Sequence, residues 1–302
     1  MKRWLIAGFI ILAAAGAGGY WWTQNRLLPV TVMPDDSLFV APNMDPGQER
    51  ASLEMLLPSK GIHAFMLHQV GEPLFIHAPD GSLMGILAEG LWASPNQRHW
   101  RVRLRLSLWL HDGHLMDPAW VIQALHQVAG GPFEAGAKAK VVDDRTFDLN
   151  FKAPWDLLKH LADPTALLLS GSGNQIIGSG PFRFDPSDSD PNHLVRFDGY
   201  RHGNAGIAAL AFPDDPALMD GHRWAQDIVA GRYALAIYPG NVPPDDMALV
   251  RNAPYDMLRM QDGSAWFISR RMRRLHPNYL DWTLTPLYGA WQADMALPYD
   301  PR

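Results

Sequence analysis

The first 22 residues constrain the location of the whole chain, and so its possible folds, more than any other part of the sequence. After Lys2 and Arg3, residues 4–22 form an uncharged run of 19 residues. As a helix this run is about 28 Å long, close to the thickness of a bilayer's hydrocarbon core. It ends in Tyr20, Trp21 and Trp22, which suit the headgroup level. We therefore expect residues 1–26 to form a single-pass anchor in the cytoplasmic (inner) membrane, with the body facing the periplasm or the cell exterior.

A cleaved signal peptide is the alternative for the same segment. The stretch Ala15-Gly16-Ala17 has the small-x-small pattern of a cleavage site and follows an apolar run. In that case the protein is secreted after cleavage near Ala17. Both interpretations export the chain, and they differ only in whether it stays attached to the membrane.

The composition of the chain excludes several classes of function. There are no cysteines among 302 residues, which removes disulfides, thiolate nucleophiles, cysteine-based zinc sites and lipid attachment to an N-terminal cysteine. The formal net charge is -5, and the first 26 residues contain basic side chains but no acids. The body is thus more acidic still, and we expect no nucleic acid as a partner.

Alternating and helical patterns predict an α/β architecture. Residues 100–110 alternate apolar with mostly polar side chains, which predicts a strand with one buried face. Asp117 and Pro118 form an N-cap and first-turn pair for a helix that should end at Gly130. Further strands are predicted at 29–33, 74–77, 146–151, 182–184 and 233–238, and further helices at 48–57, 154–161 and 218–231. Strands that alternate with helices indicate a mixed fold with more than one sheet.

No pattern in the sequence indicates catalysis or a metal. The nucleophile-elbow, P-loop, zincin and dinucleotide-binding motifs are all absent. His111 and His114 flank a tight turn, and without a third ligand nearby a structural role is favoured over metal binding. The acidic loop 185–192 lacks the glycine and distal glutamate of a calcium loop. We expect a non-enzymatic protein with no cofactor and no metal.

A series of short motifs, in order, resembles the family 5 extracellular solute-binding proteins, the oligopeptide, dipeptide and nickel binders of ABC importers. The series extends from about residue 30 to residue 269, and the order is more specific than any one motif. It comprises Val70-Gly71-Glu72-Pro73-Leu74, Pro79-Asp80-Gly81, Leu87-Ala88-Glu89-Gly90-Leu91-Trp92, Trp100 to Arg105, Leu110-His111-Asp112-Gly113, Asp117 to Val121, Val141 to Phe151, Gly178-Ser179-Gly180-Pro181-Phe182 and Gly231 to Ala236.

The resemblance implies a type II periplasmic-binding-protein fold with a discontinuous lobe I and an inserted lobe II. Lobe I would comprise residues 27–66 and 177–302, and lobe II residues 67–176. In the family the chain then crosses into a third lobe that closes over the ligand. Here the sequence after Ser269 continues through a short, dissimilar stretch to Arg302, so the expected fold is a truncated one without lobe III.

The same resemblance names candidate ligand-binding residues on the wall of lobe I. Tyr238, Asn241, Trp266 and Phe267 resemble residues near the ligand cleft and the crossover strands. Tyr238 alternatively caps the hydrophobic core. A cleft with one wall buries much less of its ligand, so we expect weak or lost binding of a peptide.

Two functions from different classes follow. The first is an extracytoplasmic peptide-binding-protein-like component that works beside an ABC permease. The second is a membrane-tethered scaffold that docks another membrane protein on the exposed face of lobe I. An anchored hydrolase would need a nucleophile and a base that the sequence does not offer.

Overall fold

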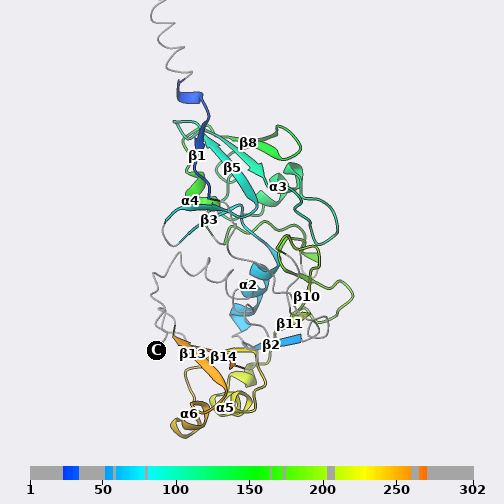
Figure 1. The fold of residues 1–302 in the computed structure, drawn as a ribbon, viewed down its shortest axis with the longest axis vertical. Helices are drawn as coiled ribbons and strands as arrows, with labels where there is room; N and C mark the ends of the chain where they lie inside the picture. The colour runs from blue at the N-terminus through cyan, green and yellow to red at the C-terminus, as the bar shows by residue number, and fades with distance from the viewer. Residues whose placement is uncertain are drawn as a thin grey trace, which may run out of the picture.

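The structure is a computed structural model that describes most of the 302-residue chain in two lobes (Figure 1). The described residues are 23–33, 52–56, 59–78, 81–163, 165–172, 175–202, 208–259 and 265–270. We call the described residues within 28–33 and 72–168 the five-strand lobe, after its main sheet. Those within 52–70 and 178–270 are the seven-strand lobe.

The main sheet of the five-strand lobe is antiparallel throughout, in the order β1-β5-β6-β8-β7. Two of its pairs, β5 with β6 and β7 with β8, join strands that follow each other along the chain. A smaller hairpin, β3 with β4, and the helices α3 and α4 complete the lobe. The elements are β1 (Leu28–Val30), β3 (Phe75–His77), β4 (Leu83–Gly85), β5 (Ala88–Ala93), β6 (His99–Leu104), α3 (Pro118–Leu125), β7 (Lys138–Val141), β8 (Thr146–Asn150) and α4 (Leu157–Leu161).

The predicted alternation is confirmed in β6 but is wrong in its extent. Trp100, Val102 and Leu104 are buried in the core of the lobe, as period two requires. The strand ends at Leu104, although the pattern predicted it to Leu110. Ser107 has a φ of 57°, a left-handed conformation that turns the chain out of the sheet.

The predicted start of α3 is confirmed at atomic detail. The Asp117 carboxylate accepts a hydrogen bond from the backbone N–H of Trp120 at 2.7 Å, and Pro118 occupies the first helical position. The helix ends at Leu125, earlier than the glycines at 130 and 131 suggested. Val121, Ala124 and Leu125 are completely buried, so one face of α3 packs on the core.

The sheet of the seven-strand lobe has the order β13-β14-β12-β2-β11-β10-β9. Its central strand β2 is parallel to both neighbours, β11 and β12, while the outer pairs are antiparallel. The helix α2 buries Ile62, Phe65, Met66 and Val70 in the core. The elements are β2 (Ser52–Leu56), α2 (Ser59–Val70), β9 (Phe182–Phe184), β10 (His193–Arg196), β11 (Ala209–Ala211), η2 (Pro216–Met219), α5 (Gly221–Val229), β12 (Leu235–Ile237), α6 (Pro244–Val250), β13 (Tyr255–Arg259) and β14 (Ala265–Ser269).

The helix predicted at 48–57 is wrong, because residues 52–56 form β2. The helix α2 begins at Ser59, two residues after the end of the predicted helix. The run Ser52–Leu56 has only five residues, which is too short for its pattern to tell a strand from a helix. Long-range pairing, Leu53 with Leu210 and Met55 with Leu235, makes it a strand.

The first strand belongs to a different lobe from the one that the motif boundaries suggested. Those boundaries placed residues 27–66 in lobe I, but Leu28 and Val30 of β1 pair with Ala93 and Leu91 of β5.

Within the described ranges, no helix has both the length and the apolar composition that a membrane span requires. The predicted span over residues 4–22 lies outside those ranges.

Candidate functional site

Glu72 lies at the junction of the two lobes, two residues beyond the end of α2. Its side chain is only 7% exposed, although it is a carboxylate. Its backbone carbonyl accepts a hydrogen bond from the N–H of Leu168 at 3.0 Å, which fixes the segment against the far end of the five-strand lobe's chain. A buried carboxylate in this position requires partners, because an uncompensated charge in the interior is very costly.

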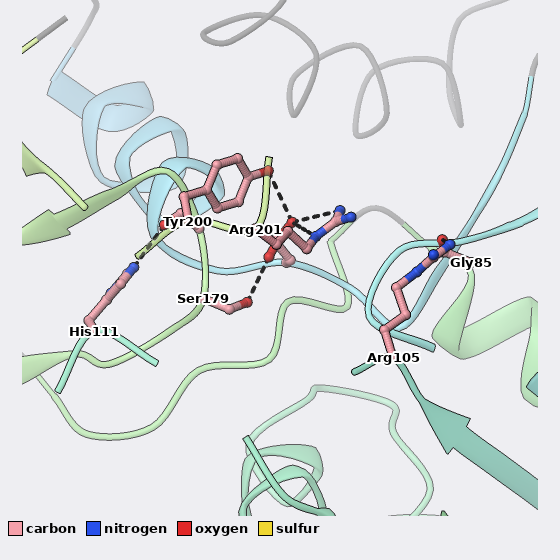
Figure 2. A network of polar contacts seen from close by, with 8 residues as sticks. Gly85, Arg105, His111, Ser179, Tyr200 and Arg201 are labelled. Atoms are coloured by element: carbon pink, nitrogen blue, oxygen red, sulfur yellow. Dashed lines mark hydrogen bonds and ion pairs between the residues drawn. The ribbon is translucent and has the colours of Figure 1, made fainter. Parts of the chain in front are cut away.

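Among the described residues, the hydrogen-bond partners of the Glu72 side chain come from the seven-strand lobe (Figure 2). Ser179 donates its hydroxyl to Oε2 at 2.8 Å, and the Tyr200 hydroxyl donates to Oε1 at 3.2 Å. Arg201 donates Nε and Nη2 to the same Oε1 at 3.2 and 3.1 Å. We call these four residues, together with the neighbouring His111 whose own contacts are described next, the Glu72 network. It ties the start of the five-strand lobe to residues 179–201 of the other lobe.

His111 provides a second tie between the lobes, from a turn of the five-strand lobe. Gly178 donates its N–H to Nδ1 at 3.3 Å, so the ring proton lies on Nε2, which is 2.9 Å from the carbonyl of Gly180. Burial lowers the pKa of His111 to about 4, and the weaker opposing effect of the Gly180 hydrogen bond does not restore it. The imidazole is therefore neutral at physiological pH. Its ring also packs edge-on against Phe197, with centroids 4.8 Å apart.

The glycines of the Gly178-Ser179-Gly180 stretch are required by close packing. A Cβ atom at Gly178 would lie 2.1 Å from the carbonyl oxygen of Val70, and one at Gly180 would lie 2.3 Å from that of Gln69. The backbone of this stretch thus runs directly against the last turn of α2. The Gly180 N–H donates to the Val70 carbonyl at 2.9 Å, which satisfies a carbonyl at the helix end.

Arg105 anchors the neighbouring loop of the five-strand lobe (Figure 2). Its Nη2 donates to the Gly85 carbonyl at 2.7 Å. Its Nε is buried and has no hydrogen-bond partner among the described residues. The other two arginines of the same stretch pair with acids of their own lobe, Arg101 with Asp148 and Arg103 with Glu89.

This arrangement suits a structural junction, because its polar groups are used in contacts between the lobes. Both oxygens of Glu72 are occupied by donors, and both ring nitrogens of His111 are engaged with backbone groups. Among the described residues, no group of three or more His, Cys, Asp or Glu side chains is placed to hold a metal ion. His114, which was considered beside His111 for a metal, is exposed and lies next to Asp112 instead.

The predicted ligand-binding residues lie elsewhere, around β12 and β14 of the seven-strand lobe. Tyr238 follows β12 directly and is partly exposed, and Asn241 is exposed in the next turn. Trp266 is paired through its backbone with Ile237 and Leu258, and its side chain lies outside the described part of the structure. Phe267 is only 5% exposed. The structure therefore brings Tyr238, Trp266 and Phe267 to neighbouring strands.

Two of these residues belong to one aromatic cluster, which we define as Trp224, Tyr238 and Phe267. Trp224 is fully buried and lies edge-on to both other rings, with centroids 5.7 Å from Tyr238 and 5.0 Å from Phe267. Its indole Nε1 has no hydrogen-bond partner within the described chain. Phe267 and Trp224 thus support the ring of Tyr238 from the core side, and Tyr238 is the member that reaches the surface.

The sequence motifs include residues of the junction, but they do not predict that these residues join the two lobes. Glu72 and Ser179 each stand in a stretch that was used for the resemblance, yet neither was assigned a role. Tyr200 and Arg201 carried no signal at all. The only available clue was an acid in the mainly apolar stretch Val70 to Leu74, and nothing in its surroundings reveals partners that lie more than a hundred positions away.

Comparison with solved structures gives clear matches in fold. The ABC transporter substrate-binding protein CtaP of Listeria monocytogenes matches with a TM-score of 0.55 and 19% identity, over 69% of this chain and 48% of that one. The oligopeptide-binding protein AppA of Bacillus subtilis, in complex with a nonapeptide, matches with a TM-score of 0.55 and 14% identity, over 69% and 47%. NikA of Brucella suis, in complex with Fe(III)-EDTA, matches with a TM-score of 0.53 and 19% identity, over 77% and 49%.

These matches confirm the predicted resemblance at the level of the fold, which is that of the ABC transporter substrate-binding proteins. The chain spans about half the length of the structures it matches. A nonapeptide and a metal chelate are bound by two proteins of this one fold, so the fold alone does not determine the ligand. No protein-family model matches the chain, and neither does any curated protein.

Proposed function

We propose that this polypeptide is a non-enzymatic, extracytoplasmic component of the substrate-binding-protein type, that it works beside an ABC importer for peptides, and that it is held at the membrane by residues 4–22. The observation that carries the proposal is the fold match to ABC transporter substrate-binding proteins over 69% of the chain. The occupied state of the Glu72 network supports a non-enzymatic role, because its acid and its imidazole are both used to join the lobes.

The ligand-facing wall in this proposal is the surface around Tyr238. Its ring is supported by Trp224 and Phe267 and so presents a fixed aromatic face, which suits contact with a peptide side chain. Asn241 is exposed close by in sequence and offers an amide donor and acceptor. The matched part of the chain covers 48% of the CtaP structure. A surface that contacts a ligand from one side only buries less of it, so we expect weak binding at this wall.

Calorimetric titration of the full chain, in detergent, with di- to hexapeptides tests this proposal. We expect no heat of binding or a Kd in the millimolar range, and any binding that is measured should be lost in Tyr238→Ala. Met257→Ala, at an exposed position on the edge strand β13, is the matched control and should bind as the native chain does. Sub-micromolar binding of any peptide would contradict the proposal of weak binding.

The tether is tested separately by extracting membranes at alkaline pH and determining the mass of the mature protein. A retained anchor predicts that the intact chain stays with the membrane. A mature protein that starts at Gly18 would exclude the anchor and leave the proposal of an exported component in place.

A scaffold that docks another membrane protein is the second candidate. It is favoured by exposed apolar side chains on α6 and β13 of the seven-strand lobe, where Leu249 is 60% and Met257 is 48% exposed. Photo-crosslinking from these two positions in intact membranes should recover a defined partner. Recovery of none, together with measurable peptide binding, would reject the scaffold.

A further inference from the structure

The strand register brings one end of the five-strand sheet next to the point where the chain enters it. Leu28 pairs with Ala93, Ala93 with Trp100, and Trp100 with Leu149, so these residues form one row across the sheet. The next row outward contains His99, Asn150 and Lys138. Beyond these rows lie the residues just before β1, the turn between β5 and β6, and the segment after β8. We call these three segments, together with the row that contains His99, Asn150 and Lys138, the entry end of the sheet.

The entry end is basic in a protein that is acidic overall. Arg26 lies two residues before β1, Arg98 lies in the β5–β6 turn, Lys138 begins β7 and Lys152 follows β8; all four are exposed. No ion pair of Arg98, Lys138 or Lys152 occurs among the described residues. The whole chain has a formal net charge of -5, so a group of four cations at one end of one sheet is a marked asymmetry.

The acids near the entry end are engaged with backbone groups. Asp156 accepts hydrogen bonds from the N–H groups of Leu158 and Lys159, as the N-cap of α4. Glu134, in the segment that leads to β7, accepts from the Gly130 N–H at 3.2 Å. The opposite end of the sheet differs, because its two arginines, Arg103 and Arg145, both pair with Glu89. Arg98, Lys138 and Lys152 thus differ from the two arginines at the opposite end, which both pair with an acid.

An aromatic stack lies beside these cations. The Trp155 ring stacks on Phe151 and on His160, with centroids 4.7 and 4.9 Å apart. The backbone N–H of Trp155 donates to the Gln97 carbonyl at 3.0 Å, which joins this residue to the β5–β6 turn. Trp155 is partly exposed, and a half-buried indole held in place next to basic side chains is typical of a surface that meets lipid headgroups.

The entry end also follows closely after the proposed tether, on which this part of the proposal rests. If residues 4–22 lie in the bilayer, Leu28 follows the last of them by six residues. Six residues span at most about 22 Å, so β1 must begin close to the membrane surface. Figure 1 shows the start of the described chain at the end of the five-strand lobe farthest from the seven-strand lobe.

We propose that the entry end of the five-strand sheet is a lipid-contact surface that rests on anionic headgroups. Arg26, Arg98, Lys138 and Lys152 contact the phosphates, and Trp155 lies at the headgroup level. The seven-strand lobe, with Tyr238, then points away from the membrane. The surface determines how the tethered molecule is oriented, which the tether alone does not.

Probes at single cysteines test the orientation, since the native chain contains no cysteine to interfere. The full chain is reconstituted in vesicles of phosphatidylcholine alone or with about one-third phosphatidylglycerol. A donor dye is placed at Pro95→Cys, in the β5–β6 turn, or at Leu249→Cys, in α6, and an acceptor dye is placed on the lipid headgroups. We expect strong energy transfer from position 95 and weak transfer from position 249 in anionic vesicles. Transfer from 95 should fall in neutral vesicles and at roughly 1 M salt.

The variant R98E/K138E/K152E provides the decisive comparison. Each basic residue at an anionic surface contributes roughly fivefold to partitioning, so loss of three should lower the membrane-resting population by at least about 100-fold, and the added negative charges lower it further. Transfer from position 95 should then fall to its value in neutral vesicles. The variant R223E/R232E/R251E changes the net charge equally on the seven-strand lobe and should leave the transfer unchanged. Equal transfer from positions 95 and 249, or transfer that ignores both lipid charge and the first variant, would overturn the proposal.

The experiments distinguish a wrong proposal about the tether from a wrong proposal about the lipid-contact surface. If alkaline washing strips the chain from vesicles, the tether proposal is wrong, and co-flotation with vesicles at neutral pH becomes the deciding measurement. Flotation that requires phosphatidylglycerol and is lost in R98E/K138E/K152E supports the lipid-contact surface. No flotation with either kind of vesicle overturns it.

Discussion

The two lobes are both built on a sheet, but their sheets differ in how far apart in the sequence some of the paired strands lie. In the five-strand lobe the pairs β5–β6 and β7–β8 join strands separated by short turns. In the seven-strand lobe the central strand β2 pairs with β11 and β12, so that residue 53 meets residue 210 and residue 55 meets residue 235. Local pairs need little loop closure, whereas the parallel pairs of β2 form only after a long stretch of chain has been brought back. The hairpins β5–β6 and β7–β8 therefore depend on local pattern, whereas the central strand β2 depends on the rest of the molecule.

The junction determines whether these two lobes behave as one unit. Glu72 and His111 reach from the five-strand lobe to residues 178–201 of the other lobe, and they do so through buried polar contacts. The following predictions test how strongly the junction couples the lobes, and then how far each lobe is locally determined.

The largest effect is expected for Glu72→Gln. The substitution removes the negative charge that faces the Arg201 guanidinium, whose side chain is 12% exposed. Removing one member of a buried pair costs about 3–5 kcal/mol, so the free energy of unfolding measured in urea should fall by this amount. Hydrogen exchange should increase first at residues 178–201.

Glu89→Gln is the matched control for this prediction. Glu89 pairs with Arg103 and Arg145 at the surface, inside one lobe, and its side chain is 37% exposed. An exposed pair contributes about 0–1 kcal/mol, so this variant should be nearly as stable as the native chain. Equal losses in the two variants would mean that the Glu72 network does not couple the lobes.

A smaller effect, dependent on pH, is expected from His111. Its pKa is about 4 in the folded state because it is buried, while an unfolded histidine titrates near 6.5. Between these values the unfolded chain binds the proton and the folded chain does not. The stabilisation is therefore complete above pH 6.5 and is lost as the pH falls toward 4. His111 alone should make the protein about 2 kcal/mol less stable at pH 5 than at pH 7.

The variant His111→Gln isolates this contribution in urea unfolding at the two pH values. Its stability should change by about 2 kcal/mol less between pH 7 and pH 5 than that of the native chain. His68 has its pKa lowered to about 4 as well, chiefly by burial, and remains present in both proteins, so it cancels from the comparison. His77→Gln, at an exposed position in β3, should show the native pH dependence. An unchanged pH dependence in His111→Gln would exclude a buried neutral imidazole at the junction.

The smallest effects are expected at the helix caps, one in each lobe. Asp117 accepts one backbone N–H at the start of α3, and Asp220 accepts two at the start of α5. Asp117→Ala and Asp220→Ala should each lower the free energy of unfolding by about 1 kcal/mol, and the asparagine variants should lose only a few tenths. Thermal and urea unfolding measure both. Similar losses would show that a helix cap contributes equally to stability in the two lobes. A loss that is several times larger in one lobe would contradict this.

The candidate site was predictable only in part. The motif around Tyr238 and Phe267 placed both residues near adjacent strands, but whether they bind a ligand stays a prediction. The sequence did not foresee that Phe267 is almost fully buried against Trp224, because burial depends on the crossing of α5 and β14. The role of Glu72 could not be predicted either, since its partners Tyr200 and Arg201 lie far along the chain and carry no pattern of their own.

The sequence by itself determined the features that depend on neighbours within a few residues. These are the alternation of β6, the Asp117 cap of α3, and the ordered motifs that resemble the substrate-binding proteins. Only the tertiary structure decided that residues 52–56 are a strand, that β1 joins the five-strand sheet, and that Glu72 meets Arg201. The physical reason is range: periodicity and capping act through contacts along the local chain, whereas a central parallel strand and a buried ion pair exist only when distant segments have been packed together.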